Sequence, residues 1–310
     1  MLWGLPGDTP IAQVQAALAQ HGRPAFLFDQ RDVPQAELEL RTDAVVEGSL
    51  RIGERTVELA DISAVYMRLH DTRRLPGLRD LDANSPLLAH ALTLVDALSG
   101  WVEVTRALVV NRPLAMASNT SKPYQLRLIE RHGFQVPDTL LTTDPETARA
   151  FWDEHGTVIY KSISGVRSIV AKLSPARAER LDDIRWCPTQ FQQYVPGTDY
   201  RVHIVGDEVF AAEISSSADD YRYAHRLGTT ADVRSCSIPA DVADRCRALS
   251  RHLGLHVAGV DLRRHPDGRW YCFEVNPSPA FSFFQGETGQ PIDAAIARLL
   301  IAGRADAQRV

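Results

Sequence analysis

The sequence predicts an α/β (α+β) protein, and three patterns lead to this fold class. Residues 1–113 alternate apolar strand-like runs with amphipathic helical patterns, which is typical of a largely parallel sheet. Residues 187–310 contain two antiparallel hairpin signals, at Gly206-Asp207 and Asp267-Gly268. The 310 residues are 45% hydrophobic and 24% charged, so they can bury the core of one large domain or of two to three small ones. We expect three parts, at 1–113, 114–186 and 187–310.

The first part begins with the clearest alternation of strands and helices. Strands are expected at 1–5, 25–29, 63–68 and 107–110, and helices at 9–20 and 84–106. Thr9 is a suitable N-cap because Pro10 then takes the first helical position, where a missing N–H costs nothing. Two further short strands are expected at 37–46 and 49–59, around Glu47-Gly48 and Gly53. Arg68, His70 and Arg73 follow a strand end, where we expect a solvated loop rather than a cleft.

Charge and cysteine usage exclude several classes of protein. The net charge of −5 argues against a nucleic-acid binder that depends on bulk positive charge. No apolar run is expected to reach a membrane-spanning length, and the N-terminus lacks the pattern of a signal peptide. The four cysteines are scattered without a CxxC pair, which indicates reduced thiols rather than a metal or disulfide framework. We therefore expect a cytoplasmic protein with no nucleic-acid or membrane partner.

Lysine is rare in this chain. Lys122, Lys161 and Lys172 are the only lysines among 34 basic residues, so the other 31 are arginine. A lysine that persists against this bias suggests a need for a compact ammonium group, such as contact with phosphate. Lys122 stands where a helix is expected to begin, and free N–H groups there favour anions. Lys161 lies on a strand expected at 157–162, whereas Lys172 has no such context.

A small polar loop follows Lys161. Ser164 and Gly165 open it, and a further strand is expected after it at 169–173. The backbone N–H groups of such a loop can fold over phosphates. The GxxxxGK[ST] pattern of a Walker A loop is absent, and a plain hairpin is the alternative interpretation.

The hairpin around Asp267-Gly268 carries three oxygen ligands. If these two residues form the turn, Pro266 pairs with Arg269, Arg263 with Cys272, and Asp261 with Glu274. Because side chains alternate along a strand, Asn276 then shares the face of Asp261 and Glu274. The other face is expected to be core, formed by Val260, Leu262, Phe273 and Val275. Two facing carboxylates and an amide suit Mg²⁺; the alternative is a solvated face whose acids pair with Arg263 and Arg264.

The rest of the third part supplies the remaining candidates. A strand is expected at 190–195, and a second hairpin places Arg201 and His203 on the face opposite Val202 and Ile204. Residues 215–228, which include Arg222, form a polar stretch that is a candidate substrate loop. Helices are expected at 241–253 and 291–301, followed by a frayed tail at 304–310.

Taken together, these features resemble the ATP-grasp superfamily. The resemblance covers roughly residues 115–303 and depends on Lys122, Lys161, QFQQYVPGTDYRVHIVGDEVFAAEI and VDLRRHPDGRWYCFEVNPSP in this order. The sequence is most similar to RimK-like carboxylate–amine ligases, and the PDTLLTTDPE and DYR segments are similar to microviridin-type (graspetide) peptide macrocyclases. The resemblance implies an ATP-grasp fold, with an N-terminal pre-ATP-grasp domain and two lobes that clasp the nucleotide.

The resemblance also implies roles for individual residues. Lys122 and Lys161 would hold the phosphates of ATP, and the loop with Ser164 and Gly165 would close over them. The adenine and ribose would meet a strand edge and its continuation, formed by Gln192, Gln193, Tyr194, Val195 and Asp199. Many relatives have Glu at the position of Gln193. Mg²⁺, or Mn²⁺ in its place, would be bound by Asp261, Glu274 and Asn276. Arg201 and Arg222 would stabilise the phosphoryl group and the acyl phosphate.

The implied activity is a Mg-ATP-dependent ligase that releases ADP and phosphate. A carboxylate of an amino acid or peptide would be phosphorylated, and an amine or hydroxyl would then displace the phosphate. Pro277-Ser278-Pro279-Ala280-Phe281 stands where many macrocyclases have glycine and tryptophan, so free amino acids and short peptides stay open as substrates. The alternatives are an ATP-grasp kinase that phosphorylates a hydroxyl and a non-catalytic nucleotide-gated binding module. A homodimer is common among such relatives and is left open here.

Overall fold

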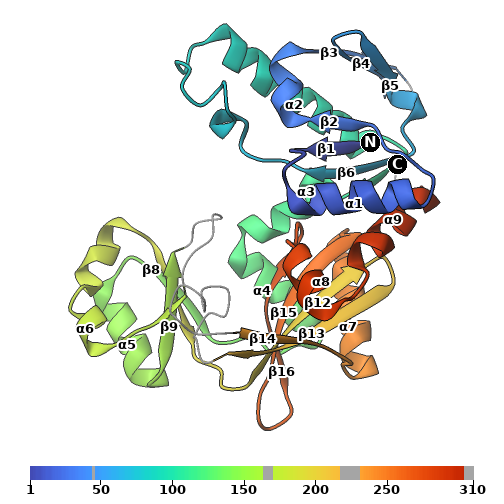
Figure 1. The fold of residues 1–310 in the computed structure, drawn as a ribbon. Helices are drawn as coiled ribbons and strands as arrows, with labels where there is room; N and C mark the ends of the chain where they lie inside the picture. The colour runs from blue at the N-terminus through green and yellow to red at the C-terminus, as the bar shows by residue number, and fades with distance from the viewer. Residues whose placement is uncertain (44–45, 163–169, 217–230, 304–310) are drawn as a thin grey trace.

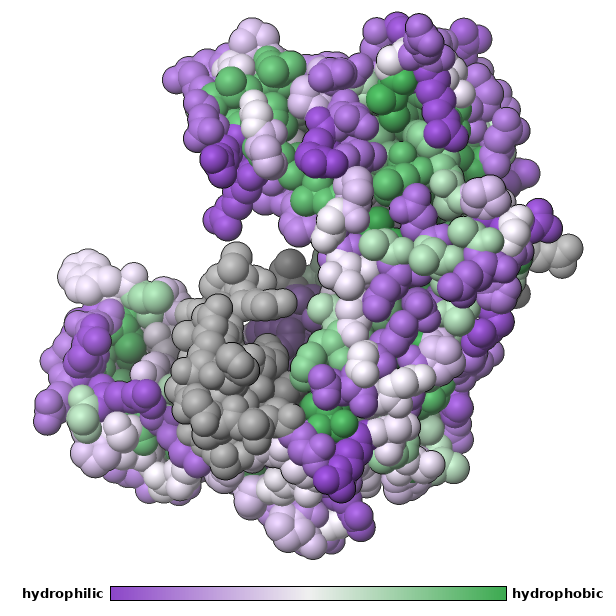
Figure 2. Space-filling view, viewed as in Figure 1, coloured by the Kyte–Doolittle hydropathy of each residue, from purple (hydrophilic) through white to green (hydrophobic). Residues whose placement is uncertain are grey.

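The computed structural model describes residues 1–43, 46–162, 170–216 and 231–303 (Figure 1). Within these residues the strands form four sheets, two of four strands, one of five and one of three. Figure 1 shows the N-terminal part above, a central lobe with the yellow-green strands at the lower left, and a C-terminal lobe at the lower right. In Figure 2 open space separates the N-terminal part from the central lobe, and hydrophilic residues cover much of the face in view.

The N-terminal sheet is parallel, as predicted, and is buried on both faces. Its strand order is β2-β1-β6-β7, formed by β1 (Leu2–Gly4), β2 (Leu27–Asp29), β6 (Ala64–Arg68) and β7 (Leu108–Val110). Leu2 and Tyr66 pack with helix α1 (Thr9–Gln20), whereas the adjacent Trp3 and Val65 pack with helix α2 (Pro86–Val104). Neighbouring residues of one strand therefore enter different cores, as strand periodicity requires.

Helix α2 corrects one expectation from the sequence. It is 19 residues long and apolar enough to cross a membrane by length and composition, so the expectation that no apolar run reaches that length is wrong. One side of the helix is buried against the sheet through Leu88, Ala91, Leu94, Leu98, Trp101 and Val102. Asp96, on another side, is exposed. This distribution is that of an amphipathic core helix packed on a sheet.

A small antiparallel sheet extends the N-terminal part. It contains β3 (Ala36–Thr42), β4 (Val46–Ile52) and β5 (Arg55–Glu58), where the sequence predicted two strands. The predicted turn at Glu47-Gly48 is wrong, because both residues lie within β4. A Cβ atom on Gly48 would lie 1.8 Å from the Glu39 carbonyl oxygen, so the glycine permits close approach of the strands.

The central lobe has its own sheet and its own small core. The strand order is β10-β9-β11-β8, formed by β8 (Thr139–Thr142), β9 (Val158–Ser162), β10 (Ala171–Lys172) and β11 (Thr189–Gln193). Helix α5 (Pro145–His155) begins after Asp144, whose carboxylate accepts from the Glu146 and Thr147 N–H groups. Together with helix α6 (Pro175–Ala178), these elements bury one cluster that contains Ala148, Val158 and Phe191.

The C-terminal lobe is built on an antiparallel sheet of order β14-β13-β12-β15-β16. The strands are β12 (Thr198–Val205), β13 (Glu208–Ser216), β14 (Ala231–Cys236), β15 (Val257–Arg264) and β16 (Trp270–Asn276). Helices α4 (Lys122–Arg131) and α7 (Ala240–His252) cover one face. Helix α8 (Ser282–Thr288) covers the other face, where Phe284 packs against Ala212 and Ile214. The sequence did not predict β14 or α8.

Two helices connect the lobes to the N-terminal part. The short helix α3 (Pro113–Met116) follows β7 and leads toward α4. The last helix, α9 (Ile292–Ala302), packs against α1 and shares its core, with Ile292, Ile296 and Leu300 beside Ile11 and Val14. The N-terminal sheet and the C-terminal lobe therefore share one hydrophobic core (Figure 1).

The two predicted hairpins are both present, and one has a different register near its turn. The β12–β13 pair has Val202 opposite Ala211 and Ile204 opposite Val209, as predicted. In the β15–β16 pair Asp261 lies opposite Glu274, as predicted, but Arg263 pairs with Tyr271 rather than Cys272. The His265 N–H donates to the Arg269 carbonyl over 2.9 Å, so Pro266-Asp267-Gly268 forms a three-residue loop.

A β-bulge restores the register beyond that loop. The ladder shifts between Asp261 and Leu262, which leaves Phe273 as the extra residue of β16. Phe273 was expected in the core but is only partly buried, and the Arg263 guanidinium carbon lies 5.3 Å from its ring centre. Cys272, which is fully buried, packs on Leu262 in its place.

Candidate active site

The three predicted metal ligands lie together at the end of the β15–β16 hairpin. Asp261 faces Glu274 across the ladder, and Asn276 lies two residues further along β16. On the opposite face Val260 and Val275 are fully buried, so the three oxygen-bearing side chains point away from that core. The side chains of Asp261 and Glu274 keep 28% and 24% of their exposure, which leaves them accessible to a ligand.

Two cations meet these carboxylates. Lys122, at the start of α4, donates from Nζ to Glu274 Oε1 over 2.5 Å and to Asn119 Oδ1 over 3.0 Å. Arg201 on β12 donates from Nη1 to Asp261 Oδ1 over 2.5 Å. The alternative in which the acids pair with Arg263 and Arg264 is therefore wrong for Arg263, which binds Asp199.

The ionisation of Glu274 follows from these neighbours. Burial by itself would raise its pKa, but the charges of Lys122, Lys161 and Arg201 and the hydrogen bond from Lys122 outweigh burial and lower the pKa. Glu274 is consequently a carboxylate at neutral pH. Lys161 acts from β9 of the central lobe, so cationic groups from both lobes act on this carboxylate.

Arg201 is held in place by its surroundings. It is 6% exposed, and its guanidinium carbon lies 5.7 Å from the ring centre of Phe284 on α8. Gly259 on β15 provides the space: a Cβ atom there would lie 2.2 Å from Arg201 Nη2. His203, on the same strand face, is fully buried, and burial lowers its pKa well below the usual value, so it adds no charge.

The predicted nucleotide residues extend from β11 into the segment that follows it. Gln192 lies inside the sheet, between Thr139 of β8 and Ile159 of β9, so a strand edge at this residue is wrong. Its side-chain amide donates to Thr139 Oγ1 over 2.9 Å. The Gln193 N–H donates to the Asp138 carbonyl and the Tyr194 N–H to the Thr157 carbonyl. The predicted contact with adenine is therefore restricted to the chain beyond Gln192 and stays a prediction there.

Arg263 ties this segment to the C-terminal lobe. It binds both carboxylate oxygens of Asp199, at 2.6 and 2.8 Å, and donates to the Val195 carbonyl over 2.7 Å. Its guanidinium carbon also lies 5.8 Å from the ring centre of Tyr194. Asp199 thus has a bidentate partner that the sequence reading did not assign to it. Lys172 also approaches this segment, with Nζ 4.6 Å from the ring centre of Tyr194.

Three predicted site residues fall outside the description. Ser164, Gly165 and Arg222 lie in 163–169 and 217–230, which are not among the described residues. Their assignment to the phosphates and to the acyl phosphate stays a prediction.

The donor set of the hairpin fits a hard divalent cation. Facing carboxylates repel unless a cation lies between them, and here Lys122 and Arg201 supply that charge. Oxygen ligands without His or Cys are those that Mg²⁺ prefers. In the part of the chain that is described, no three His, Cys, Asp or Glu residues are grouped to hold a metal. The predicted third ligand is the amide of Asn276, whose Oδ1 accepts from the Ser278 N–H over 2.9 Å.

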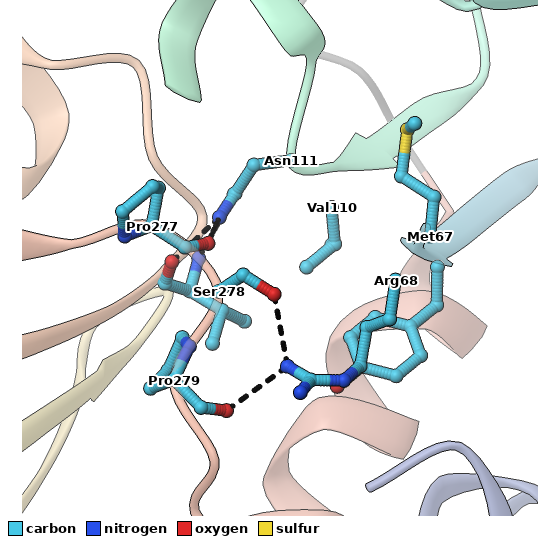
Figure 3. Close-up of a pocket in the computed structure, with 9 residues that line it drawn as sticks. Met67, Arg68, Val110, Asn111, Pro277, Ser278 and Pro279 are labelled. Carbon is cyan, nitrogen blue, oxygen red and sulfur yellow. Dashed lines mark hydrogen bonds between the residues drawn. The ribbon is translucent and has the colours of Figure 1, made fainter. Parts of the chain in front are cut away.

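Two residues of the N-terminal part contact the segment next to this site and were not predicted to do so. Arg68, at the end of β6, was expected in a solvated loop, but it binds Asp8 and donates to Ser278 Oγ and the Pro279 carbonyl (Figure 3). Asn111, just after β7, donates to the Pro277 carbonyl over 2.6 Å (Figure 3). These residues line a small pocket beside Asn276, at the carboxyl ends of two parallel strands. His70 and Arg73 are exposed, as predicted.

Known proteins are similar to this chain in both sequence and fold. The family model of the RimK-like ATP-grasp domain matches residues 118–300. The ribosomal protein bS6–L-glutamate ligase of Escherichia coli O81 (strain ED1a) is 28% identical over 279 residues, which cover 84% of this chain and 89% of that protein. The ATP-grasp ligase PsnB, solved with a phosphomimetic variant of its minimal precursor, Mg and ADP, is 28% identical with a TM-score of 0.79, over 97% of each chain.

A further solved structure supports the fold over the whole length. The RiPP-associated ATP-grasp ligase of Chryseobacterium gregarium, in complex with ADP and a leader and core peptide, has a TM-score of 0.83 at 24% identity. The alignment covers 100% of this chain and 98% of that chain. The expected ATP-grasp fold is confirmed.

Proposed function

Because the chain belongs to the RimK-like ATP-grasp family and is an ADP-forming, Mg-ATP-dependent ligase, we propose that its acyl donor is a carboxylate of a peptide. The likeness to PsnB carries this proposal, because it spans 97% of both chains and therefore includes the N-terminal part that the family model leaves out. PsnB was solved with a minimal precursor peptide. A small pocket lies between Arg68 and Asn111 of that N-terminal part and the segment that directly follows Asn276.

The geometry supports a separate role for each of the site residues. Asp261, Glu274 and Asn276 would hold Mg²⁺, which neutralises phosphate charge when bound. Lys122 already lies beside Glu274 and would contact the same phosphates as the metal. Arg201 is fixed beside Asp261 and presents a cation where negative charge builds up on the transferred phosphoryl group.

The reaction follows from this placement. A carboxylate oxygen of the substrate attacks the γ-phosphorus of ATP, the bond to the bridging oxygen breaks, and ADP leaves. An amine or hydroxyl then attacks the acyl carbon, loses its proton, and expels inorganic phosphate. In this scheme the protein supplies positioning and charge stabilisation, and no side chain becomes covalently modified.

Hydroxylamine trapping tests the proposal. Mg-ATP, hydroxylamine and the protein are incubated with acidic peptides, dipeptides or free amino acids, and ADP and hydroxamate are measured. We expect ADP and a hydroxamate with an acidic peptide, and neither from a Glu274→Ala control. A hydroxamate formed only from a free amino acid would refute the peptide donor. ADP without any hydroxamate would instead indicate a kinase.

Two further expectations stay proposals. A cytoplasmic location fits the free cysteines Cys187, Cys236, Cys246 and Cys272, since reduced thiols are usual there. Fractionation of the native host tests it. A two-fold dimer is tested by sedimentation of the purified chain.

A further inference from the structure

A buried glutamine contacts the strand that carries two of the metal ligands. Gln125 lies on α4, one turn after Lys122, and is 1% exposed. Its Nε2 donates to the Val275 carbonyl over 2.9 Å, and its Oε1 accepts from the Val275 N–H over 3.1 Å. The side-chain amide therefore forms both hydrogen bonds that a neighbouring strand would form.

The position of Val275 makes this contact relevant to the metal site. Strand β16 is the last strand of its sheet, and its outer side is bridged by Gln135 at Tyr271. Further along, at Val275, the partner of this outer side is the Gln125 side chain. The N–H and C=O of Val275 point toward that outer side, because both bind Gln125. Glu274 and Asn276 flank Val275, and their side chains lie on the metal face. A backbone held at Val275 fixes the spacing of both ligands.

A second amide holds the same segment from the N-terminal part. Asn111 is 2% exposed and donates from Nδ2 to the carbonyls of Pro277 and Val257, each over 2.6 Å. Its Oδ1 accepts from the His256 and Val257 N–H groups. Asn276 thus stands between two residues whose backbones are bound by buried amides. The two amides come from different parts of the fold.

We propose that Gln125 is a positioning residue for the divalent metal: its amide holds β16 at Val275, so that Glu274 and Asn276 meet one cation together with Asp261, and Asn111 supports the same segment at Pro277. The proposal depends on the metal-site assignment and not on the nature of the acyl donor. Removal of the amide leaves a buried N–H and C=O unpaired and frees the strand edge. The ligands then lose their fixed spacing, and metal affinity falls.

The chain offers a matched control. Gln30 is also fully buried, donates to the His70 carbonyl over 2.6 Å and accepts from the His70 N–H over 2.9 Å. Gln30→Met therefore removes the same kind of amide clamp at a site that contacts no metal ligand. Gln125→Met and Gln30→Met keep a similar side-chain volume and should lower the melting temperature in the same way.

Direct metal binding tests the proposal. Mn²⁺ binding to the full chain in the presence of ADP is measured by electron paramagnetic resonance, and melting temperatures are recorded without metal. We expect Gln125→Met to raise the Mn²⁺ dissociation constant about tenfold or more, as loss of an outer-shell partner does. Gln30→Met should leave it unchanged, and ADP binding without metal should be unchanged in both.

The outcomes that overturn the proposal are distinct. Equal Mn²⁺ affinity in the two variants would show that Gln125 has only a structural role. A wild-type protein that binds no Mn²⁺ would overturn the metal-site assignment itself. If Gln125→Met does not fold, Gln125→Asn replaces it, because its amide is one methylene too short to reach both Val275 groups, and the same rise in the dissociation constant is expected.

Discussion

Gly259→Ala is expected to disable the phosphoryl-transfer step through Arg201 alone. The new Cβ atom would lie 2.2 Å from Nη2 and 2.6 Å from Cζ of Arg201, whereas unstrained contacts are about 3.5 Å or longer. The guanidinium must therefore move by about 1.3 Å. Its pair with Asp261 is already at 2.5 Å, so it cannot move closer and the hydrogen bond must lengthen or bend. The ring of Phe284, whose centre lies 5.7 Å from the guanidinium carbon, also limits its movement.

The size of the effect follows from the hydrogen bond that a displaced Arg201 would no longer donate to the transferred phosphoryl group in the transition state. A hydrogen bond between charged groups is worth about 1.5–3 kcal/mol, which corresponds to a decrease in kcat of about 10- to 150-fold. Phosphate release and hydroxamate formation measure kcat, and circular dichroism confirms the fold. Gly286→Ala on α8 is the control, since a Cβ atom there meets nothing within 4 Å. A folded Gly259→Ala protein with wild-type kcat would refute the positioning of Arg201 described here.

Three other perturbations test separate features. Lys161→Ala should weaken ATP binding about 10- to 150-fold, as measured by calorimetry. Glu274→Ala should remove turnover and largely keep nucleotide binding. Wild-type turnover in both variants would refute the assignment of these two residues to the active site. Glu274 has a folded pKa below its usual 4.5, so its carboxylate stabilises the fold above pH 4.5 and this contribution is lost as the pH falls through the folded value. Urea unfolding of metal-free protein should show that loss, and Glu274→Gln should reduce it. Ile296→Ala, in the core shared by α1 and α9, should cost about 2–5 kcal/mol in urea unfolding, and exposed Ile301→Ala about 0.5 or less.

The hairpin of the metal site shows how a correct prediction can come from two errors. A two-residue turn was expected at Asp267-Gly268, but the loop has three residues and moves every pair near it by one. The bulge at Phe273 then moves the register back, so Asp261 still meets Glu274. A turn dipeptide such as Asp267-Gly268 predicts that a hairpin exists. It does not predict whether the loop has two residues or three, and that difference of one residue sets the register. Alternation was also ambiguous, because Cys272 and Phe273 are both apolar and either can fill the core position.

Contacts between distant segments were beyond the reach of the sequence. Gln125 binds a residue 150 positions away, and Arg68 binds Ser278 across 210 positions. For Gln125, the only local signal was its place as a polar residue on the buried side of an amphipathic helix. For Arg68, the only local signal was its place at the end of a strand. The lysine bias drew attention to Lys122, which lies beside Glu274, because rarity is visible in composition. Arginine is so common here that Arg201, Arg263 and Arg68 could not be distinguished by type.

The two lysines of the site belong to different bodies of the protein, and this affects what each can do. Lys122 lies on α4, which packs on the C-terminal sheet, so its distance from Glu274 is fixed by the core that holds the metal ligands. Lys161 lies on β9 of the central lobe, whose buried core among the described residues lies between 148 and 191, with Leu140 packed against it. The N-terminal part, by contrast, shares a core with the C-terminal lobe through α1 and α9. Among the described residues the core of the central lobe is thus separate from the core behind the metal site. The phosphates that Lys161 is predicted to bind would connect the two lobes. Lys122 should therefore keep its contact with Glu274 whether or not nucleotide is bound. Lys161 already acts on Glu274 through its charge, and it should be held in place by the phosphates once nucleotide binds.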